Sequence, residues 1–202
     1  MADRSLPRSF YLRASWVVAP DLLGKVIVVG PCRARIVEVE AYGGVADPAS
    51  HAYRGPTART RPMFGLGGHL YVYFSYGMHW CTNVVTGPAD IGQAVLLRAL
   101  EPLAGEDDMR DRRPTARREV DLTNGPGKLS AALGIGRAHD GADLVPQRRR
   151  LAPGAEHVPA VRIVDDGAAS PTSVATGPRI GLSKARETPW RFWVPGNRFV
   201  SR

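Results

Sequence analysis

The sequence predicts a single α+β domain over residues 1–202, built on a curved, mostly antiparallel β-sheet with short peripheral helices and a protruding β-hairpin. Between residues 25 and 102, segments rich in β-branched and aromatic residues follow one another at short intervals, which predicts consecutive strands. Segments with helical patterning are short and lie outside these strands. A chain of 202 residues with 44% hydrophobic residues suits one core, and no internal repeat or change of composition marks a second domain.

The first predicted elements are a helix and two strands. Residues 9–24 have helical patterning, with Ser15 or Asp21 as the candidate N-cap. The β-branched run KVIVV predicts a strand that ends at the turn GPC. The segment ARIVEVEAY (34–42) alternates strictly, which predicts a strand with one buried face. In this alternation one face carries Val37, Val39 and Ala41 toward the core, and the polar face opposite the core carries Ile36, Glu38, Glu40 and Tyr42.

Residues 43–68 form a long connection rich in Gly, Pro, Arg and Thr, with neither helical nor strand periodicity. Connections of this length are usually functional or disordered. The segment carries His51, Arg54, Arg59 and Arg61. We therefore expect a basic surface that adapts to a ligand, and disorder in the absence of a ligand is the alternative.

The segments LYVYF and CTNVVT, within residues 70–86, predict a β-hairpin with the tip SYGMHW. Alternation puts Tyr71 and Tyr73 on one face, where paired rings can stack a base. We expect Phe74 to fill the core. Tyr76 precedes a glycine at the tip, where its own strand cannot bury it. It is a candidate wedge for a base stack, and such an insertion costs roughly a few kcal/mol per step.

The segment AVLLRALEP (94–102) is almost continuously apolar and predicts a strand deep in the sheet. Arg98 interrupts it, and an unpaired buried guanidinium is very costly, so we expect Glu38 and Glu40 as its partners. These two glutamates are roughly 6.6 Å apart along one strand face. Either of them could serve as a general base, and a solvent-facing pair without a task is the alternative.

The remainder of the chain is predicted to form short elements between loops. Residues 103–118 are charged with partial helical character, and a short helix from about Lys128 could hold a phosphate at its amino end. Residues 140–167 are expected to be loops with a strand at AVRIV. Near the C-terminus, FWV and RFV predict a final pair of strands.

The charge balance points to a polyanionic partner. The chain has 27 Lys and Arg against 19 Asp and Glu, a net charge of +8. Its two cysteines and its polar start predict no disulfide framework and a cytoplasmic protein. Neither CxxC nor HExxH occurs, and no run approaches the ~18 apolar residues of a membrane span, so we expect neither a metal nor a membrane partner.

Three functions remain compatible with these residues. The first is an enzyme that flips a base out of duplex DNA, with Tyr76 filling the vacated space and a glutamate as base. The second is a noncatalytic nucleic-acid-binding module that stacks single-stranded bases on its rings. The third is a sugar hydrolase with a carboxylate pair, which the net charge of +8 disfavours.

Six segments, in their order and spacing, resemble the alkyladenine (3-methyladenine) DNA glycosylase family of the mammalian type. They are RIVEVEAY, ASHAYRGPTARTRPMF, LYVYFSYGMHWCTNV, AVLLRALEP, NGPGKLSAALGI and RIGLSKARETPWRFWVPGNRFVS. Together they cover nearly the whole chain, which is far more specific than any short pattern.

The resemblance implies roles for individual residues. Glu40 matches the general base and Arg98 the arginine that helps to position the attacking water. Three residues match those that enclose and stack on the flipped base, namely Tyr42, His51 and Tyr73, and Asn83 matches the residue that disfavours the exocyclic amino group of guanine. The predicted DNA contacts are Tyr76 as the minor-groove wedge, Met63 and Met78 beside the lesion, and the basic residues Arg59, Arg61 and Lys128.

The implied reaction is hydrolysis of the N-glycosidic bond of a flipped purine, which leaves an abasic site for base excision repair. The implied substrates are alkylated or deaminated purines, namely 3-methyladenine, 7-methylguanine, hypoxanthine and ethenoadenine. Water activated by Glu40 is expected rather than a Schiff base, because no lysine lies between Lys25 and Lys128. A neutral base also needs a proton, for which a water or His51 is the candidate donor. We expect no cofactor, and a monomer acting on duplex DNA from the minor-groove side.

Overall fold

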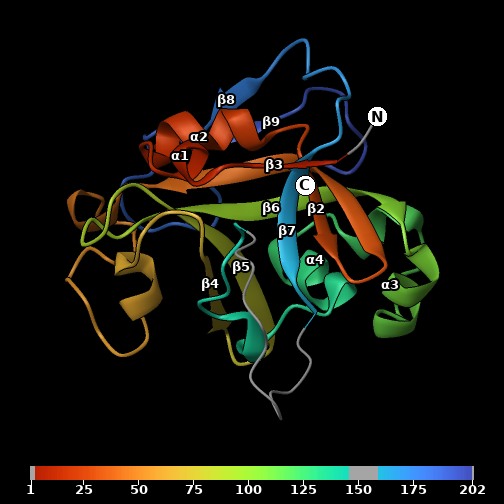
Figure 1. Cartoon of the computed structure of the whole chain (residues 1–202), viewed down its shortest axis with the longest axis horizontal. Coiled ribbons are helices and arrows are strands. Elements are labelled where there is room, and N and C mark those ends of the chain that lie inside the picture. The colour runs from red at the N-terminus through yellow and green to blue at the C-terminus, as the bar shows by residue number, and fades with distance from the viewer. Residues whose placement is uncertain (1–2, 146–158, 202) are drawn as a thin grey trace.

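The structure, a computed structural model, describes residues 3–145 and 159–201, and it forms a curved antiparallel sheet with short helices around it (Figure 1). The strands run in the order β1-β7-β2-β3-β6-β5-β4, and β9 pairs with both β3 and β8. Their bounds are β1 Arg4–Ser5, β2 Val26–Val29, β3 Cys32–Tyr42, β4 Leu70–Ser75, β5 His79–Thr86, β6 Gln93–Ala104, β7 Val161–Asp165, β8 Ala175–Gly177 and β9 Arg191–Trp193. The α+β class predicted from the sequence is confirmed.

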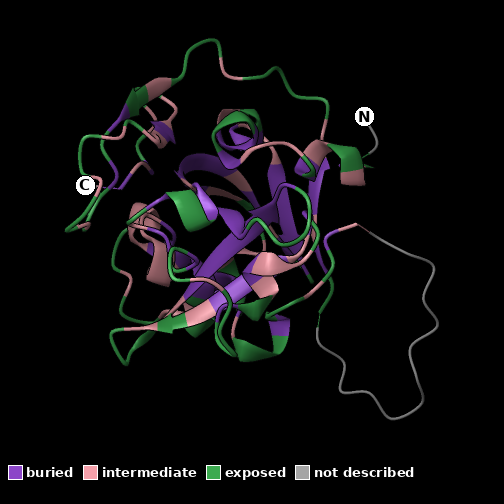
Figure 2. Cartoon of the chain, turned by 90° about the vertical axis from the view of Figure 1, so that its left-hand side faces the viewer, coloured by how far each residue is buried: buried purple, intermediate pink, exposed green. Residues whose placement is uncertain are grey.

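The helices are short and lie at the periphery of the sheet (Figure 1). The α-helices are α1 Arg8–Tyr11, α2 Ser15–Leu22, α3 Glu106–Arg112 and α4 Pro126–Leu133, and the 3-10 helices are Gly44–Ala46, Arg61–Phe64, Glu119–Leu122 and Arg137–His139. Apolar residues of α2 and α4 join those of the central strands in one large core. Figure 2 shows the buried residues concentrated along these strands. No helix among the described residues is long and apolar enough to span a bilayer.

The helical segment predicted at 9–24 is two helices, and neither predicted N-cap acts as one. Helix α2 begins at Ser15, Ala14 holds the cap position, and no side chain caps it. The backbone N–H of Ser15 donates instead to the side chain of Gln93, at 3.1 Å. Asp21 lies inside the helix and pairs with Arg13. A tertiary partner therefore replaces the local cap that the sequence predicted.

Strand β3 is longer than predicted and both of its faces are covered at its centre, which corrects the prediction of a single buried face. The register with β6 pairs Ile36 with Leu100 and then Glu38 with Ala99, so Val37 is an extra residue in this strand. This irregularity places Ile36 in the main core and Val37 in a separate cluster. The strict alternation predicted for these two residues is therefore wrong, although Glu38 and Glu40 do share a face, because both contact Arg98.

The hairpin is confirmed, and its strands extend further toward the tip than predicted. Met78 N donates to Ser75 O at 3.1 Å, which closes a tight turn around Tyr76 and Gly77. Tyr76 has φ 50°, a left-handed conformation that strains a bulky side chain. The prediction that Phe74 fills the core is wrong, because Phe74 is 46% exposed and its ring packs 4.9 Å from that of Trp80.

The C-terminal predictions hold in part. The strand at AVRIV is confirmed as β7, and helix α4 begins at Pro126, slightly before the predicted start. FWV contributes to β9, but β9 pairs with β3 and β8, and residues 198–200 form turns rather than a strand. The prediction of a final strand pair is therefore wrong. Residues 146–158 of the segment predicted as loops lie outside the described residues.

Candidate active site

A cavity of about 490 Å³ opens beside the hairpin and gathers most of the residues that the sequence singled out. The singled-out residues that line it are Glu40, Tyr42, His51, Arg59, Met63, Tyr73, Tyr76, Asn83 and Arg98. They come from β3, the 43–68 connection, the hairpin and β6, which are adjacent in the sheet or connected to it. The sheet order therefore brings together segments that are distant in the sequence.

Glu40 is a fully buried carboxylate that faces this cavity. Its Oε2 accepts a hydrogen bond from the hydroxyl of Tyr42 at 3.0 Å, and its Oε1 accepts one from the backbone N–H of Ile180 at 2.7 Å. Arg98 Nη1 lies 3.2 Å from Oε1. A buried carboxylate with three such partners is held in one orientation.

Glu38 is equally buried but is not among the residues that line the cavity. Its Oε1 accepts from Arg98 Nε at 3.1 Å, from Arg191 Nε at 2.6 Å and from the Ser201 hydroxyl at 2.9 Å. Its Oε2 accepts from the backbone N–H of Ser201 at 2.6 Å. Both oxygens of Glu38 are hydrogen-bonded, and of the two glutamates only Glu40 lines the cavity.

Three aromatic rings form one wall of the cavity. The rings of Tyr71 and Tyr73 lie 5.4 Å apart, and the ring of His51 meets Tyr73 edge-on at 4.5 Å. His51 Nδ1 is 3.1 Å from the hydroxyl of Tyr71. The guanidinium of Arg59 lies 5.4 Å from the centre of the Tyr73 ring. The wall can stack a planar base and carries a cation at its edge.

Burial and charge fix the protonation states of this wall. Partial burial lowers the pKa of His51, and the positive charge of Arg59 lowers it further. His51 is therefore neutral at pH 7, which argues against the imidazolium donor considered from the sequence. Burial raises the pKa of Tyr71 to about 12 and raises that of Tyr73 as well. Both phenols keep their protons at neutral pH.

Asn83 and Cys81 of β5 and Met63 of the 43–68 connection also line the cavity. Asn83 is buried, and its Nδ2 donates to the backbone oxygen of Tyr71 at 3.0 Å, so its amide is held in place. Cys81 also lines the cavity, and burial raises the pKa of its thiol. Met63 is only 3% exposed, so DNA could reach it only inside the cavity.

Of the remaining residues predicted to contact DNA, only Tyr76 lines the cavity. Tyr76 is 86% exposed and Met78 is 67% exposed at the hairpin tip. Arg61 is exposed on the 43–68 connection, and Lys128 donates to Asn124 Oδ1 at 2.8 Å in the first turn of α4. Met78, Arg61 and Lys128 do not line the cavity.

Sequence reasoning missed the part of the site that comes from the C-terminal segment. Ile180, Gly181 and Leu182 line the cavity, and Arg179 forms a buried ion pair with Asp47. Residues this far apart in the chain carry no shared periodicity, so no local pattern could have linked them. The sequence did place Tyr71 with Tyr73 on one strand face, and both residues line the cavity.

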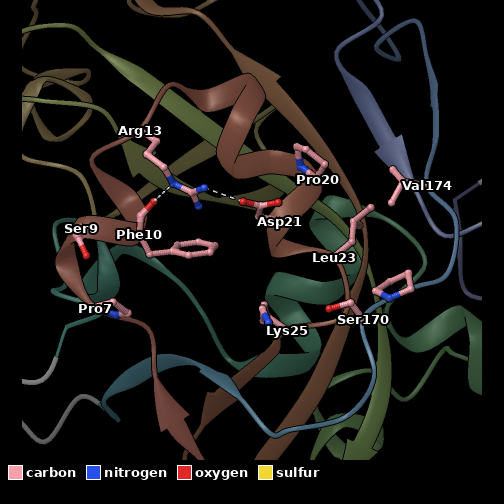
Figure 3. A pocket seen from close by; sticks show the side chains of 11 residues that line it. Pro7, Ser9, Phe10, Arg13, Pro20, Asp21, Leu23, Lys25, Ser170 and Val174 are labelled. Carbon is pink, nitrogen blue, oxygen red and sulfur yellow. Dashed lines mark hydrogen bonds and ion pairs between the residues drawn. The ribbon is translucent and has the colours of Figure 1, made fainter.

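A second cavity, of about 630 Å³, lies against α1, α2 and residues 170–174 (Figure 3). Its charged groups are already paired, Arg13 with Asp21 at 2.7 Å and Lys25 with Asp165 at 2.7 Å. A cavity without an available acid or base offers little chemistry, whatever its size. We therefore place the candidate active site at the smaller cavity. Among residues 3–145 and 159–201, no group of three or more His, Cys, Asp or Glu side chains is arranged to hold a metal.

Comparison with known proteins points to one family. Residues 9–198 match the family described as "Methylpurine-DNA glycosylase (MPG)". A protein of Burkholderia orbicola is 53% identical over 197 residues, covering 97% of this chain and 90% of its own length. One of Frankia casuarinae is 48% identical, with 95% and 90% covered, and one of Nitrosospira multiformis is 43% identical, with 98% and 94% covered. Each of the three carries the name "Putative 3-methyladenine DNA glycosylase".

Proposed function

Because the chain belongs to the methylpurine-DNA glycosylase family, we propose that this hydrolytic N-glycosidase flips damaged purines out of duplex DNA and uses Glu40 to activate the attacking water. The proposed substrates are 3-methyladenine, 7-methylguanine, hypoxanthine and ethenoadenine. The product is an abasic site, which base excision repair then processes.

The observation that carries this proposal is the asymmetry between the two buried glutamates. Glu40 lines a cavity of about 490 Å³, whereas Glu38 does not line it and is held by Arg98, Arg191 and Ser201. Arg98 contacts both carboxylates and so fixes their separation. One available base beside a stacking wall suits attack by water on a bound nucleotide.

In the proposed reaction, Glu40 accepts a proton from a water as the water oxygen bonds to C1′ of the deoxyribose. The C1′–N bond breaks, and its electron pair leaves with the purine. The negative charge of Glu40 also stabilises the oxocarbenium-like sugar. A cationic base such as 7-methylguanine leaves neutral and needs no further proton. A neutral base such as hypoxanthine must be protonated, and since His51 is neutral at pH 7 we assign that proton to a water.

A covalent route is disfavoured by the residues around the cavity. A Schiff base needs an amine near C1′, and no lysine is found among the described residues that line the cavity. The thiol of Cys81 is a weak nucleophile because burial raises its pKa. Activated water is therefore the route that these side chains favour.

Base flipping is assigned to the hairpin tip, acting on DNA from the minor groove. Tyr76 is 86% exposed, and its left-handed backbone points to a function, because strained residues cluster at functional sites. Its ring can fill the space that the extruded nucleotide leaves, at roughly a few kcal/mol for unstacking each step. The net charge of +8 supplies attraction to the phosphates, which offsets this cost. The protein is proposed to act as a monomer.

The experiment is a glycosylase assay with defined substrates. Purified protein is incubated with duplexes that each carry one lesion, and the released bases are identified by mass spectrometry. Release of free purine from alkylated duplex, abolished in Glu40→Gln while binding persists, supports the proposal. Binding without release by the wild-type protein would favour the noncatalytic module. A sugar hydrolase would instead cleave neutral glycans, a reaction disfavoured because the second carboxylate is occupied.

A further inference from the structure

Arg179 and Asp47 form an ion pair sealed from solvent beside the cavity. Their side chains are 0% and 2% exposed, and two guanidinium nitrogens donate to the two carboxylate oxygens. Burial alone would raise the pKa of Asp47, but the bonds from Arg179 and from the backbone amides of Gly43 and Ala49 hold it below its usual value. Asp47 is thus ionised at neutral pH, and neither side chain of the pair lines the cavity.

Arg179 contacts the stretch of β3 that carries the proposed general base. Its Nη1 also donates to the carbonyl oxygen of Ala41 at 3.0 Å, the residue between Glu40 and Tyr42. Its guanidinium lies 4.8 Å from the centre of the Tyr42 ring. The next residue in the chain, Ile180, donates its N–H to the Glu40 carboxylate. Two of the hydrogen-bond donors to that carboxylate are therefore held in place by Arg179.

Asp47 fixes the start of the 43–68 connection, which contributes His51 to the aromatic wall. It accepts hydrogen bonds from the backbone N–H groups of Gly43 and Ala49, each at 3.0 Å. Ala49 lines the cavity, and so does His51 two residues later. The ion pair therefore connects β3, this connection and the C-terminal segment beside the cavity.

We propose that Arg179 and Asp47 are positioning residues for hydrolysis, which hold Glu40, Tyr42 and the wall carrying His51 at the spacing that a flipped nucleotide needs. This inference rests on the proposed function. Strand β3 is already anchored by pairing with β6 and β9, so its stability does not depend on Arg179 alone. Misplacement of a reacting group by about 1 Å can lower a rate by about 100-fold.

The test compares Arg179→Gln, Arg179→Lys and Asp47→Asn with the wild type under conditions where circular dichroism shows each protein folded. Arg35→Gln is the matched control, because Arg35 also pairs with an aspartate, Asp166, and also donates to a backbone oxygen, that of Gly24, outside the cavity. Three quantities are measured. They are the single-turnover rate of purine release from methylated duplex, the affinity for a duplex with an abasic-site analogue, and hydrogen exchange at the Ile180 amide, which is followed by NMR.

Arg179→Gln is expected to lower the single-turnover rate by about 100-fold while affinity changes by less than about threefold. The Ile180 amide should exchange faster in each variant of the pair and not in Arg35→Gln. If Arg179→Gln does not fold, the test relies on Arg179→Lys, which keeps the positive charge but loses the bidentate contact with Asp47. Its single-turnover rate and the exchange of its Ile180 amide then decide whether the inference holds. A folded variant with a rate within about twofold of wild type, or with unchanged Ile180 exchange, overturns the inference. A wild-type protein that releases no purine refutes the proposed function instead.

Discussion

The backbone nitrogen of Ile180 lies 2.7 Å from Oε1 of Glu40, across 140 residues of sequence. This contact brings the C-terminal segment to the carboxylate that β3 presents, and with Tyr42 and Arg98 it leaves Glu40 in one orientation. A general base must be held within hydrogen-bond reach of the water that it deprotonates. The fold therefore holds the Glu40 carboxylate in a fixed orientation, which a solvent-exposed glutamate on a two-stranded hairpin would not have.

Replacing Glu40 by Gln should remove the proposed general base and keep the shape of the side chain. We expect purine release to fall by about 10² to 10⁴-fold, the usual contribution of general base catalysis, with little change in affinity for an abasic duplex. Single-turnover release and fluorescence anisotropy measure the two quantities. Release within about tenfold of wild type would rule out Glu40 as the base.

Glu38→Gln should act on stability instead. Glu38 is buried and paired with Arg98 and Arg191, so neutralising it removes the counter-charge that it gives to Arg191 and leaves Arg98 with Glu40 alone. Breaking a buried pair typically costs about 3–5 kcal/mol in the free energy of unfolding. Urea denaturation checks this, with Glu101→Gln as a control, because Glu101 is only partly buried and accepts from the neutral amide of Asn197. Equal midpoints for the two variants would contradict the structural role of Glu38.

The sequence predicted the strands and the ring-rich hairpin because their periodicity and turn residues are local signals. It also predicted that Arg98 must pair with the glutamates, since a buried guanidinium needs a partner. It did not predict the extra residue at Val37, because strict alternation hides a bulge. Nor could it predict the pairing of Asp47 with Arg179, which depends on chain segments meeting in three dimensions.

Tyr76→Ala should weaken the binding of damaged duplex and leave the fold intact. The side chain is 86% exposed, so its removal should change the free energy of unfolding by no more than about 0.5 kcal/mol. Without the ring, the space left by the flipped nucleotide stays open, and we expect affinity to fall by about tenfold, or ~1.4 kcal/mol. Fluorescence of 2-aminopurine placed beside the lesion reports flipping. Leu103→Ala, which removes an exposed side chain of β6 outside the cavity lining, is the control. Kinetics of Tyr76→Ala that match wild type on every substrate would refute the wedge.

The titration of His51 tests the electrostatics of the base-binding wall. Its pKa is lowered by burial and by Arg59, so we expect its NMR titration midpoint below the usual ~6.5. Because a positive neighbour disfavours the imidazolium, Arg59→Ala should raise the midpoint, whereas Arg61→Ala, a change outside the cavity lining, should leave it unmoved.

The direction of the pKa shift of His51 also determines how the stability of the folded state depends on pH. Since the folded pKa is the lower one, the folded state loses stability as the pH falls below ~6.5 toward the folded value, and Arg59→Ala should reduce that loss. A wild-type midpoint at or above ~6.5 would mean that His51 is charged often enough to serve as the proton donor for neutral bases, and the assignment of that proton to water would fail.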